Sequence, residues 1–167
     1  MAELVRLGAG HAKAVLAFEV ENRAFFARSI SDRGDAYFER FAEGFDALLA
    51  EQAAGVCVFS VLIDDDGSVL GRFNMVDIED GSAVLGYRVA ERATGRGVAT
   101  AAVRELCEVA RVQFGLRSLR AAVAHTNAAS QRVLVKAGFV LVGPADPADI
   151  GGNEGVWFRR DLLSEAS

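Results

Sequence analysis

The stretch VLGYRVAERATGRGVAT, residues 84–100, decides the fold. It starts as an apolar strand, passes through a short polar turn, and reaches two glycines before a helical pattern over 98–114. The first turn of a helix has backbone N–H groups without partners and the positive end of the helix dipole. Because Gly95 and Gly97 have no side chains to block the approach, we expect a phosphate to reach these N–H groups, with Arg96 as an additional charged donor.

Two common phosphate motifs do not fit this stretch. It lacks the Gly-Lys-Ser/Thr ending of a P-loop, and Thr100 stands where a dinucleotide-binding Gly-x-Gly-x-x-Gly motif needs its last glycine. An ordinary strand-to-helix turn would also contain two glycines. A second motif is therefore needed to decide between a turn and a binding site.

Hydrophobic periodicity places the other elements on both sides of this stretch. The strand at 82–89, the helix at 98–114 and a strand at 119–124 form a βαβ unit with parallel strands. Strands are further expected at 4–7, 56–63, 69–75, 139–142 and 156–158, and helices at 11–22, 37–49 and 128–137. We expect an α/β fold (mixed α+β) with a central mixed sheet of six to seven strands, about four helices, and one domain over 1–167.

Composition excludes several classes of protein. The chain has 167 residues, 51% of them hydrophobic, with no run that approaches a membrane span and no start that resembles a signal peptide. Its two cysteines have neither disulfide-framework nor zinc-site spacing, and we expect no metal. The net charge of −5 argues against nucleic-acid binding. These features predict a cytoplasmic protein that binds neither membrane nor nucleic acid.

The charge is unevenly distributed along the chain. Residues 88–136 contain nine basic and three acidic residues, whereas residues 1–70 contain twelve acidic and six basic ones. A local positive zone suits a compact polyanion, and an acidic N-terminal part suits a cationic amine substrate. Solvated helix faces would produce part of the same asymmetry.

A second informative block is VAHTNAASQRVLVKAGF, residues 123–139. The combination of Leu-Gly-Tyr-Arg-Val, Gly-Arg-Gly-Val-Ala-Thr, Asn-Ala-Ala-Ser and Lys-Ala-Gly-Phe resembles the ribosomal-protein (Rim-type) branch of the GCN5-related N-acetyltransferase (GNAT) superfamily. The resemblance covers nearly the whole chain. It implies a splayed central sheet, acetyl-CoA as cosubstrate, direct acetyl transfer to a protein N-terminal α-amine or a small-molecule amine, and a homodimer as a common assembly.

The family's pyrophosphate motif, Gln/Arg-x-x-Gly-x-Gly/Ala, fits in two registers. Arg92-x-x-Gly95-x-Gly97 matches it literally, whereas Thr94-Gly95-Arg96-Gly97-Val98-Ala99 has Thr in the first position. We prefer the second register, because it keeps the family's spacing between the strand and the glycines and starts the helix directly after the loop.

The resemblance also implies roles for individual residues. Backbone groups of Tyr87, Arg88 and Val89 would bind the pantetheine arm and the acetyl carbonyl. The pyrophosphate would lie on the loop made of Thr94, Gly95, Arg96, Gly97, Val98, Ala99 and Thr100. Asn127 would contact the pantetheine or a water molecule, and also suits a helix cap. Arg132 or Lys136 would reach the adenosine 3′-phosphate.

Acetyl transfer needs a base for the ammonium and an acid for the CoA thiolate. Many family members use a tyrosine as the acid, but Leu134 occupies that position here. Ser130 matches a serine of the Rim-type branch and is our candidate acid. Glu79 is the candidate base. Asp77, Glu21, Glu154, a water relay and an amine that arrives neutral stay open as alternatives.

Two other functions are compatible with the sequence. A catalytically weak acyl-CoA-binding sensor or assembly module would explain the missing tyrosine, and also why Val84 and Ala122 stand where relatives often carry glutamate. A structural α/β domain without a CoA site would explain the fold alone. Binding of acetyl-CoA without turnover would indicate the first, and no binding would indicate the second.

Overall fold

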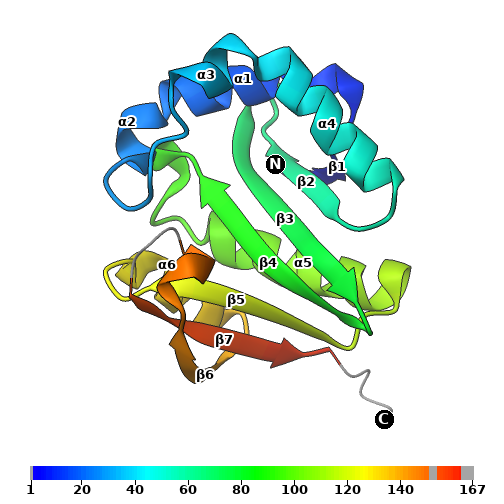
Figure 1. The fold of residues 1–167 in the computed structure, drawn as a ribbon, viewed down its shortest axis with the longest axis vertical. Coiled ribbons are helices and arrows are strands. Elements are labelled where there is room, and N and C mark those ends of the chain that lie inside the picture. The colour runs from blue at the N-terminus through cyan, green and yellow to red at the C-terminus, as the bar shows by residue number, and fades with distance from the viewer. Residues whose placement is uncertain (1, 151–153, 163–167) are drawn as a thin grey trace.

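The fold is built around one sheet of seven strands, described here from a computed structural model that covers residues 2–150 and 154–162 (Figure 1). The strand order is β1-β2-β3-β4-β5-β7-β6, and all neighbours are antiparallel except β4 and β5. The strands are β1 (Glu3–Arg6), β2 (Val58–Ile63), β3 (Val69–Glu79), β4 (Ser82–Val89), β5 (Ser118–Ala124), β6 (Val140–Ala145) and β7 (Gly155–Asp161).

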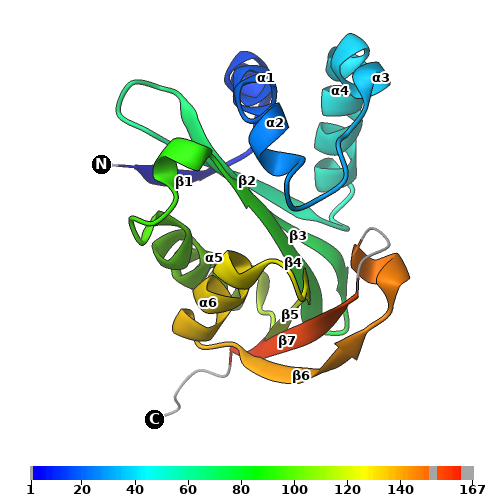
Figure 2. The same ribbon diagram turned by 90° about the vertical axis from the view of Figure 1, so that its left-hand side faces the viewer.

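Helices cover both faces of the sheet. They are α1 (Ala12–Glu21), α2 (Arg23–Phe26), α3 (Asp35–Glu39), α4 (Phe41–Ala53), α5 (Val98–Phe114) and α6 (Ala128–Lys136), with 3₁₀ turns at Ala9–His11, Glu91–Ala93 and Pro147–Ile150. Figure 2 shows α1 to α4 on one side and α5 with α6 on the other. In the described ranges, no helix is both long and apolar enough to cross a membrane.

Helical periodicity explains how the long helices pack. The buried residues of α5 are Ala102, Val103, Leu106, Cys107 and Ala110, which recur every three or four positions. In α6, Leu134 is fully buried, so this position belongs to the core. The mixed α/β class, the seven-stranded sheet and the four longer helices confirm the fold expected from the sequence.

Several element boundaries differ from the prediction. The helix expected over 37–49 is two helices, α3 and α4, because Arg40 leaves the helical conformation with φ −110° and ψ 27°. Strand β3 extends to Glu79, beyond the expected end at Met75. Its register against β4 shifts between Val76 and Glu79, where Asp77 has a left-handed φ of 51°.

The two parallel strands separate along their length. Strand β4 pairs with β5 only over Ser82–Val84 and Ser118–Arg120, and Figure 1 shows the strands meeting at one end and diverging toward the other. Beyond these residues, the described parts of β4 and β5 form no further backbone pairing with each other. The backbone edges that face this gap are therefore available to a ligand.

A buried asparagine connects the first helix to the loop before α5. Asn22 is 5% exposed, and its side-chain amide donates to the carbonyl of Phe18, while its Oδ1 accepts from the backbone N–H of Glu91. These two hydrogen bonds are 2.9 and 3.0 Å long. Asn22 therefore fixes the start of the 91–97 segment relative to α1.

Candidate active site

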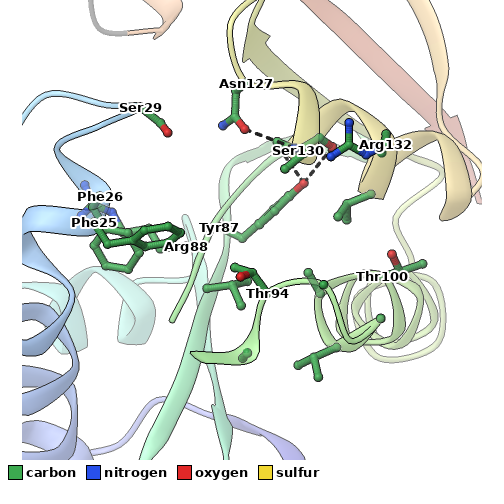
Figure 3. Close-up of a pocket in the computed structure, with 18 of the residues that line it drawn as sticks. Phe25, Phe26, Ser29, Tyr87, Arg88, Thr94, Thr100, Asn127, Ser130 and Arg132 are labelled. Carbon is green, nitrogen blue, oxygen red and sulfur yellow. Dashed lines mark hydrogen bonds between the residues drawn. The ribbon is translucent and has the colours of Figure 1, made fainter. Parts of the chain in front are cut away.

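A cleft of about 340 Å³ lies where β4 leaves β5. The strand β4, the loop before α5, the first turns of α5 and α6, and the α2 region all contribute to it (Figure 3). Of the residues predicted to bind the cosubstrate, it is lined by Tyr87, Arg88, Val89, Thr94, Gly95, Gly97, Val98, Ala99, Thr100, Asn127, Ser130, Arg132 and Lys136. Arg96 is exposed on the same loop but does not line the cleft.

The two glycines have the backbone conformation that glycine favours. Gly95 has φ 76° and Gly97 has φ 74°, and a Cβ built on either residue meets no atom within 4 Å. Gly97 is the N-cap of α5 and supplies no side-chain cap. Because the first backbone N–H groups of a helix have no partner within that helix, those of Val98 to Thr100 face an open space that suits an anion.

The contacts around the loop favour the second register of the motif. Thr94 lines the cleft, and its hydroxyl donates to the carbonyl of Glu91 at 2.7 Å. Arg92 instead reaches the β2–β3 turn, where it donates to the Ser68 hydroxyl at 2.7 Å and lies 3.6 Å from Asp64. Arg92 is thus a neighbour of the cleft rather than part of its lining.

A phenol, a hydroxyl and an amide meet in the middle of the cleft. The hydroxyls of Tyr87 and Ser130 are 2.7 Å apart, and Asn127 Oδ1 accepts from the Ser130 backbone N–H at 3.2 Å (Figure 3). The Tyr87 ring stacks on Phe73, its neighbour on β3, with the centroids 5.7 Å apart. Burial raises the pKa of Tyr87 to about 12, and the hydrogen bond to Ser130 opposes this only in part. The phenol is therefore protonated at neutral pH.

A second cleft of about 370 Å³ lies on the other side of these residues. It shares Ile30, Tyr87, Arg88, Asn127 and Ser130 with the first cleft, and is otherwise lined mainly by the separated parts of β4 and β5. Two ligands could therefore meet at one place, each entering from its own side. The described residues that line the two clefts include no aspartate or glutamate.

The candidate bases lie outside both clefts. Glu79 is exposed and pairs with Ser82 at the β3–β4 turn, five residues and roughly 17 Å along the strand from Tyr87. An amine bound at Tyr87 would therefore lie beyond direct reach of Glu79, and a role for Glu79 as the base stays a prediction. Asp77, Glu21 and Glu154 are also exposed and line neither cleft. Among the residues that the structure describes, no group of His, Cys, Asp or Glu could hold a metal ion.

The structure adds residues that the sequence did not single out. Phe25, Phe26, Ser29 and Ile30, in and just after α2, form one wall of the first cleft. The helix expected at 11–22 ends before this region, and no sequence pattern marked it. The hydroxyl of Tyr87 was missed as well, because its contact with Ser130 joins residues 43 positions apart.

Comparison with known proteins gives one family and close structural likenesses. The family model described as acetyltransferase (GNAT) domain matches residues 4–140. The probable N-acetyltransferase YjcK of Bacillus subtilis is 29% identical over 158 residues, which is 89% of this chain and 84% of that protein.

Solved structures share the whole architecture. The ribosomal-protein-S5-alanine acetyltransferase of Vibrio fischeri superposes with a TM-score of 0.89 at 18% identity, over 99% of this chain and 96% of that one. Mycobacterium smegmatis RimJ, solved in complex with CoA-disulfide, gives 0.84 at 22% identity, over 96% and 81%. The spermidine N-acetyltransferase of Vibrio cholerae, with CoA and spermine, gives 0.77 at 16%, over 96% and 95%. At these identities the likeness shows a common fold.

Proposed function

Because this chain belongs to the acetyltransferase (GNAT) domain family, we propose that it transfers acetyl from acetyl-CoA to a primary amine by direct attack in a ternary complex. The observation that carries the proposal is the pair of clefts that meet at Tyr87, Asn127 and Ser130 where β4 separates from β5. One cleft leads to the uncapped N-terminus of α5, and the other leads away between the two strands.

The first cleft fits acetyl-CoA by its chemistry. The left-handed glycines and the backbone N–H groups of Val98 to Thr100 suit the pyrophosphate. Arg132 and Lys136, both exposed on α6, would bind the 3′-phosphate. The unpaired edge of β4 would hydrogen-bond the amide groups of the pantetheine arm. When bound, acetyl-CoA supplies an electrophilic thioester carbonyl.

The hydroxyls of Tyr87 and Ser130 form the proton donor. As the amine nitrogen bonds to the acetyl carbon, the carbon–sulfur bond breaks and the sulfur needs one proton. Ser130 would give this proton and be re-protonated from Tyr87, whose raised pKa keeps it protonated near neutral pH. The amine loses one proton to water and Tyr87 regains one from water, so the protons balance.

Proton removal from the amine defines a first prediction. Because the described cleft residues include no carboxylate, we infer that the acceptor reacts as the neutral amine and gives its proton to water. A peptide α-amine has a pKa of about 7.7–8.0 and a lysine-type amine about 10.4. At pH 7, matched acceptors should differ in kcat/KM by about two orders of magnitude in favour of the α-amine. The rising limb of the pH profile should follow the pKa of each acceptor; one fixed pKa for every acceptor would indicate a protein base instead.

Two measurements test the proposed function. Acetyl-CoA should raise the melting temperature, since a ligand that binds only the folded state stabilises it. Release of free CoA should then depend on an amine from a panel of peptides and small amines. A thermal shift without turnover on any amine would support the weakly active acyl-CoA-binding module. No thermal shift and no turnover would together contradict the proposed cosubstrate site.

Ser130→Ala should lower kcat by about a hundredfold, within the range for a lost general acid, while the Kd of acetyl-CoA changes little. Tyr87→Phe should lower kcat in the same direction, because Ser130 then loses its proton source. The double variant should be no slower than the slower single variant, since the two groups act as one unit. Ser118→Ala is the matched control: its hydroxyl bonds Ser82 at 3.2 Å, where β4 and β5 still pair. Wild-type kcat for Ser130→Ala would exclude Ser130 from the reaction.

A further inference from the structure

One buried carboxylate forms ion pairs with three guanidinium groups beside the clefts. Glu19 on α1 is 1% exposed, and its carboxylate oxygens accept from Arg33 at 2.9 Å, from Arg72 at 2.8 Å and from Arg88 at 3.3 Å. Arg72 and Arg88 are cross-strand neighbours on β3 and β4, on the sheet face that α1 covers. These four residues are the arginine cluster.

The arginine cluster has more positive than negative charge. Three cations share one anion, and within the described residues no second carboxylate lies within ion-pair distance of Arg33, Arg72 or Arg88. Neutral groups provide the other contacts: Tyr37 accepts from Arg72 at 3.2 Å, and the Phe26 ring lies 5.0 Å from Arg88. Arg33 is exposed to solvent, but Arg72 and Arg88 are largely buried, and charged groups buried to that degree are ordinarily paired. The two buried arginines share a single carboxylate, which leaves positive charge that a further anion would balance.

Arg88 is the member of the cluster that faces a ligand. Of the four residues of the arginine cluster, Arg88 alone lines the two clefts. Its side chain is 18% exposed, compared with 6% for Arg72. Its contact to Glu19 is longer than those of the other two arginines. Among the described residues, only its Nη1 has a hydrogen-bond partner. Its remaining N–H groups can bind an oxyanion, and a guanidinium binds a carboxylate in a bidentate manner.

We propose that the acetyl acceptor carries a carboxylate near its amine, and that Arg88 binds this carboxylate. The inference rests on the proposed acetyl transfer and specifies its substrate class: a free amino acid, or a peptide with an acidic residue next to its N-terminus. The absence of aspartate and glutamate from the described lining disfavours polyamines, because no counter-charge awaits a second ammonium group. The acidic excess of residues 1–70, which suggested a cationic substrate, therefore contributes no carboxylate to the described lining of either cleft.

Matched acceptors test this without any variant. Phenylalanine is compared with phenylalaninamide, and seryl-glutamyl-alaninamide with seryl-glutaminyl-alaninamide, each at the pH where half of its amine is neutral. The carboxylate member of at least one pair should have a kcat/KM about ten- to a hundredfold higher, the worth of a charge-assisted hydrogen bond. The pair that responds identifies the source of the carboxylate. Equal rates within both pairs, or a better rate with spermidine, would overturn the proposal.

The Arg88→Gln variant tests whether Arg88 causes the preference for acceptors with a carboxylate. The variant should remove most of the carboxylate preference through KM, and Arg88→Lys should restore part of it. The fold should persist, because Glu19 keeps Arg33 and Arg72. Arg28→Gln is the matched control, since Arg28 is 69% exposed, pairs with Glu91 at 3.6 Å and lines neither cleft.

Failure of the proposal is distinguishable from failure of the proposed function. The thermal shift with acetyl-CoA is measured first on every variant. A weakened shift for Arg88→Gln with an unchanged acid-to-amide ratio would assign the anion site to the cosubstrate and overturn the proposal. No shift and no turnover in the unmodified protein would instead overturn acetyl transfer itself.

Discussion

Glutamine in place of Glu19 is expected to lower the free energy of unfolding by about 3–5 kcal/mol, the usual cost of removing one partner from a buried ion pair. The reason is the arginine cluster: the substitution leaves three guanidinium groups close together with no carboxylate among them. Urea denaturation followed by circular dichroism measures the effect. Glu108→Gln is the control, because Glu108 pairs with Arg111 on the surface and should leave the midpoint unchanged.

The same group makes stability depend on pH. Burial alone would raise the pKa of Glu19, but the hydrogen bonds and charges of Arg33 and Arg72 outweigh it, so the pKa lies below the ordinary value of 4.5. The stabilisation is therefore complete above the pKa of the unfolded state and is lost as the pH falls through the lower, folded-state pKa. Unfolding midpoints should decline below about pH 4.5, and the Glu19→Gln variant should lose this component of the decline. An unchanged acid profile in the variant would contradict the assignment.

Gly97→Glu is expected to weaken acetyl-CoA binding by at least about a hundredfold. A carboxylate at this position lies beside the N–H groups of the first turn of α5, where the pyrophosphate is proposed to bind, and like charges a few ångströms apart repel by several kcal/mol near a protein surface. Isothermal titration with acetyl-CoA measures the loss. If the affinity were unchanged, the pyrophosphate would have to bind elsewhere.

Gly97→Asn separates charge from backbone strain. Residue 97 has a φ of 74°, a conformation that asparagine tolerates better than most residues and that glutamate does not favour. The asparagine variant should keep most of the affinity and lose only a little stability. A large loss for both variants would show that strain in the loop, rather than negative charge, disrupts the site.

The sequence predicted the elements that depend on local patterns. The apolar stripe of α5, the glycines at its start and the asparagine cap of α6 are all encoded within a few residues of one another. The two blocks around residues 84–100 and 123–139 therefore predicted the fold and those parts of the first cleft that they contain, but not the wall at 25–30. The break at Arg40 and the extension of β3 to Glu79 lay beyond these patterns, since neither glycine nor proline marks them.

Contacts between distant residues could not be predicted in this way. Glu19 meets Arg72 and Arg88 across 53 and 69 positions, and any of the other acidic residues in the N-terminal half was an equal candidate for such a pair. Strand alternation places Tyr87 and Arg88 on opposite faces, but only the packed helices decide that one meets Ser130 and the other Glu19. The distance of Glu79 from the clefts could not be predicted for the same reason, because sequence position does not give distance from a cleft.

The separation of β4 from β5 also constrains how this protein can be stabilised. Extending their pairing beyond Val84 and Arg120 would add backbone hydrogen bonds and remove exposed polar edges. The same change would close both clefts. Selection for thermal robustness alone should therefore favour variants that narrow this gap and lose turnover. A protein that keeps the site open keeps a sheet that is less stable than a fully paired one.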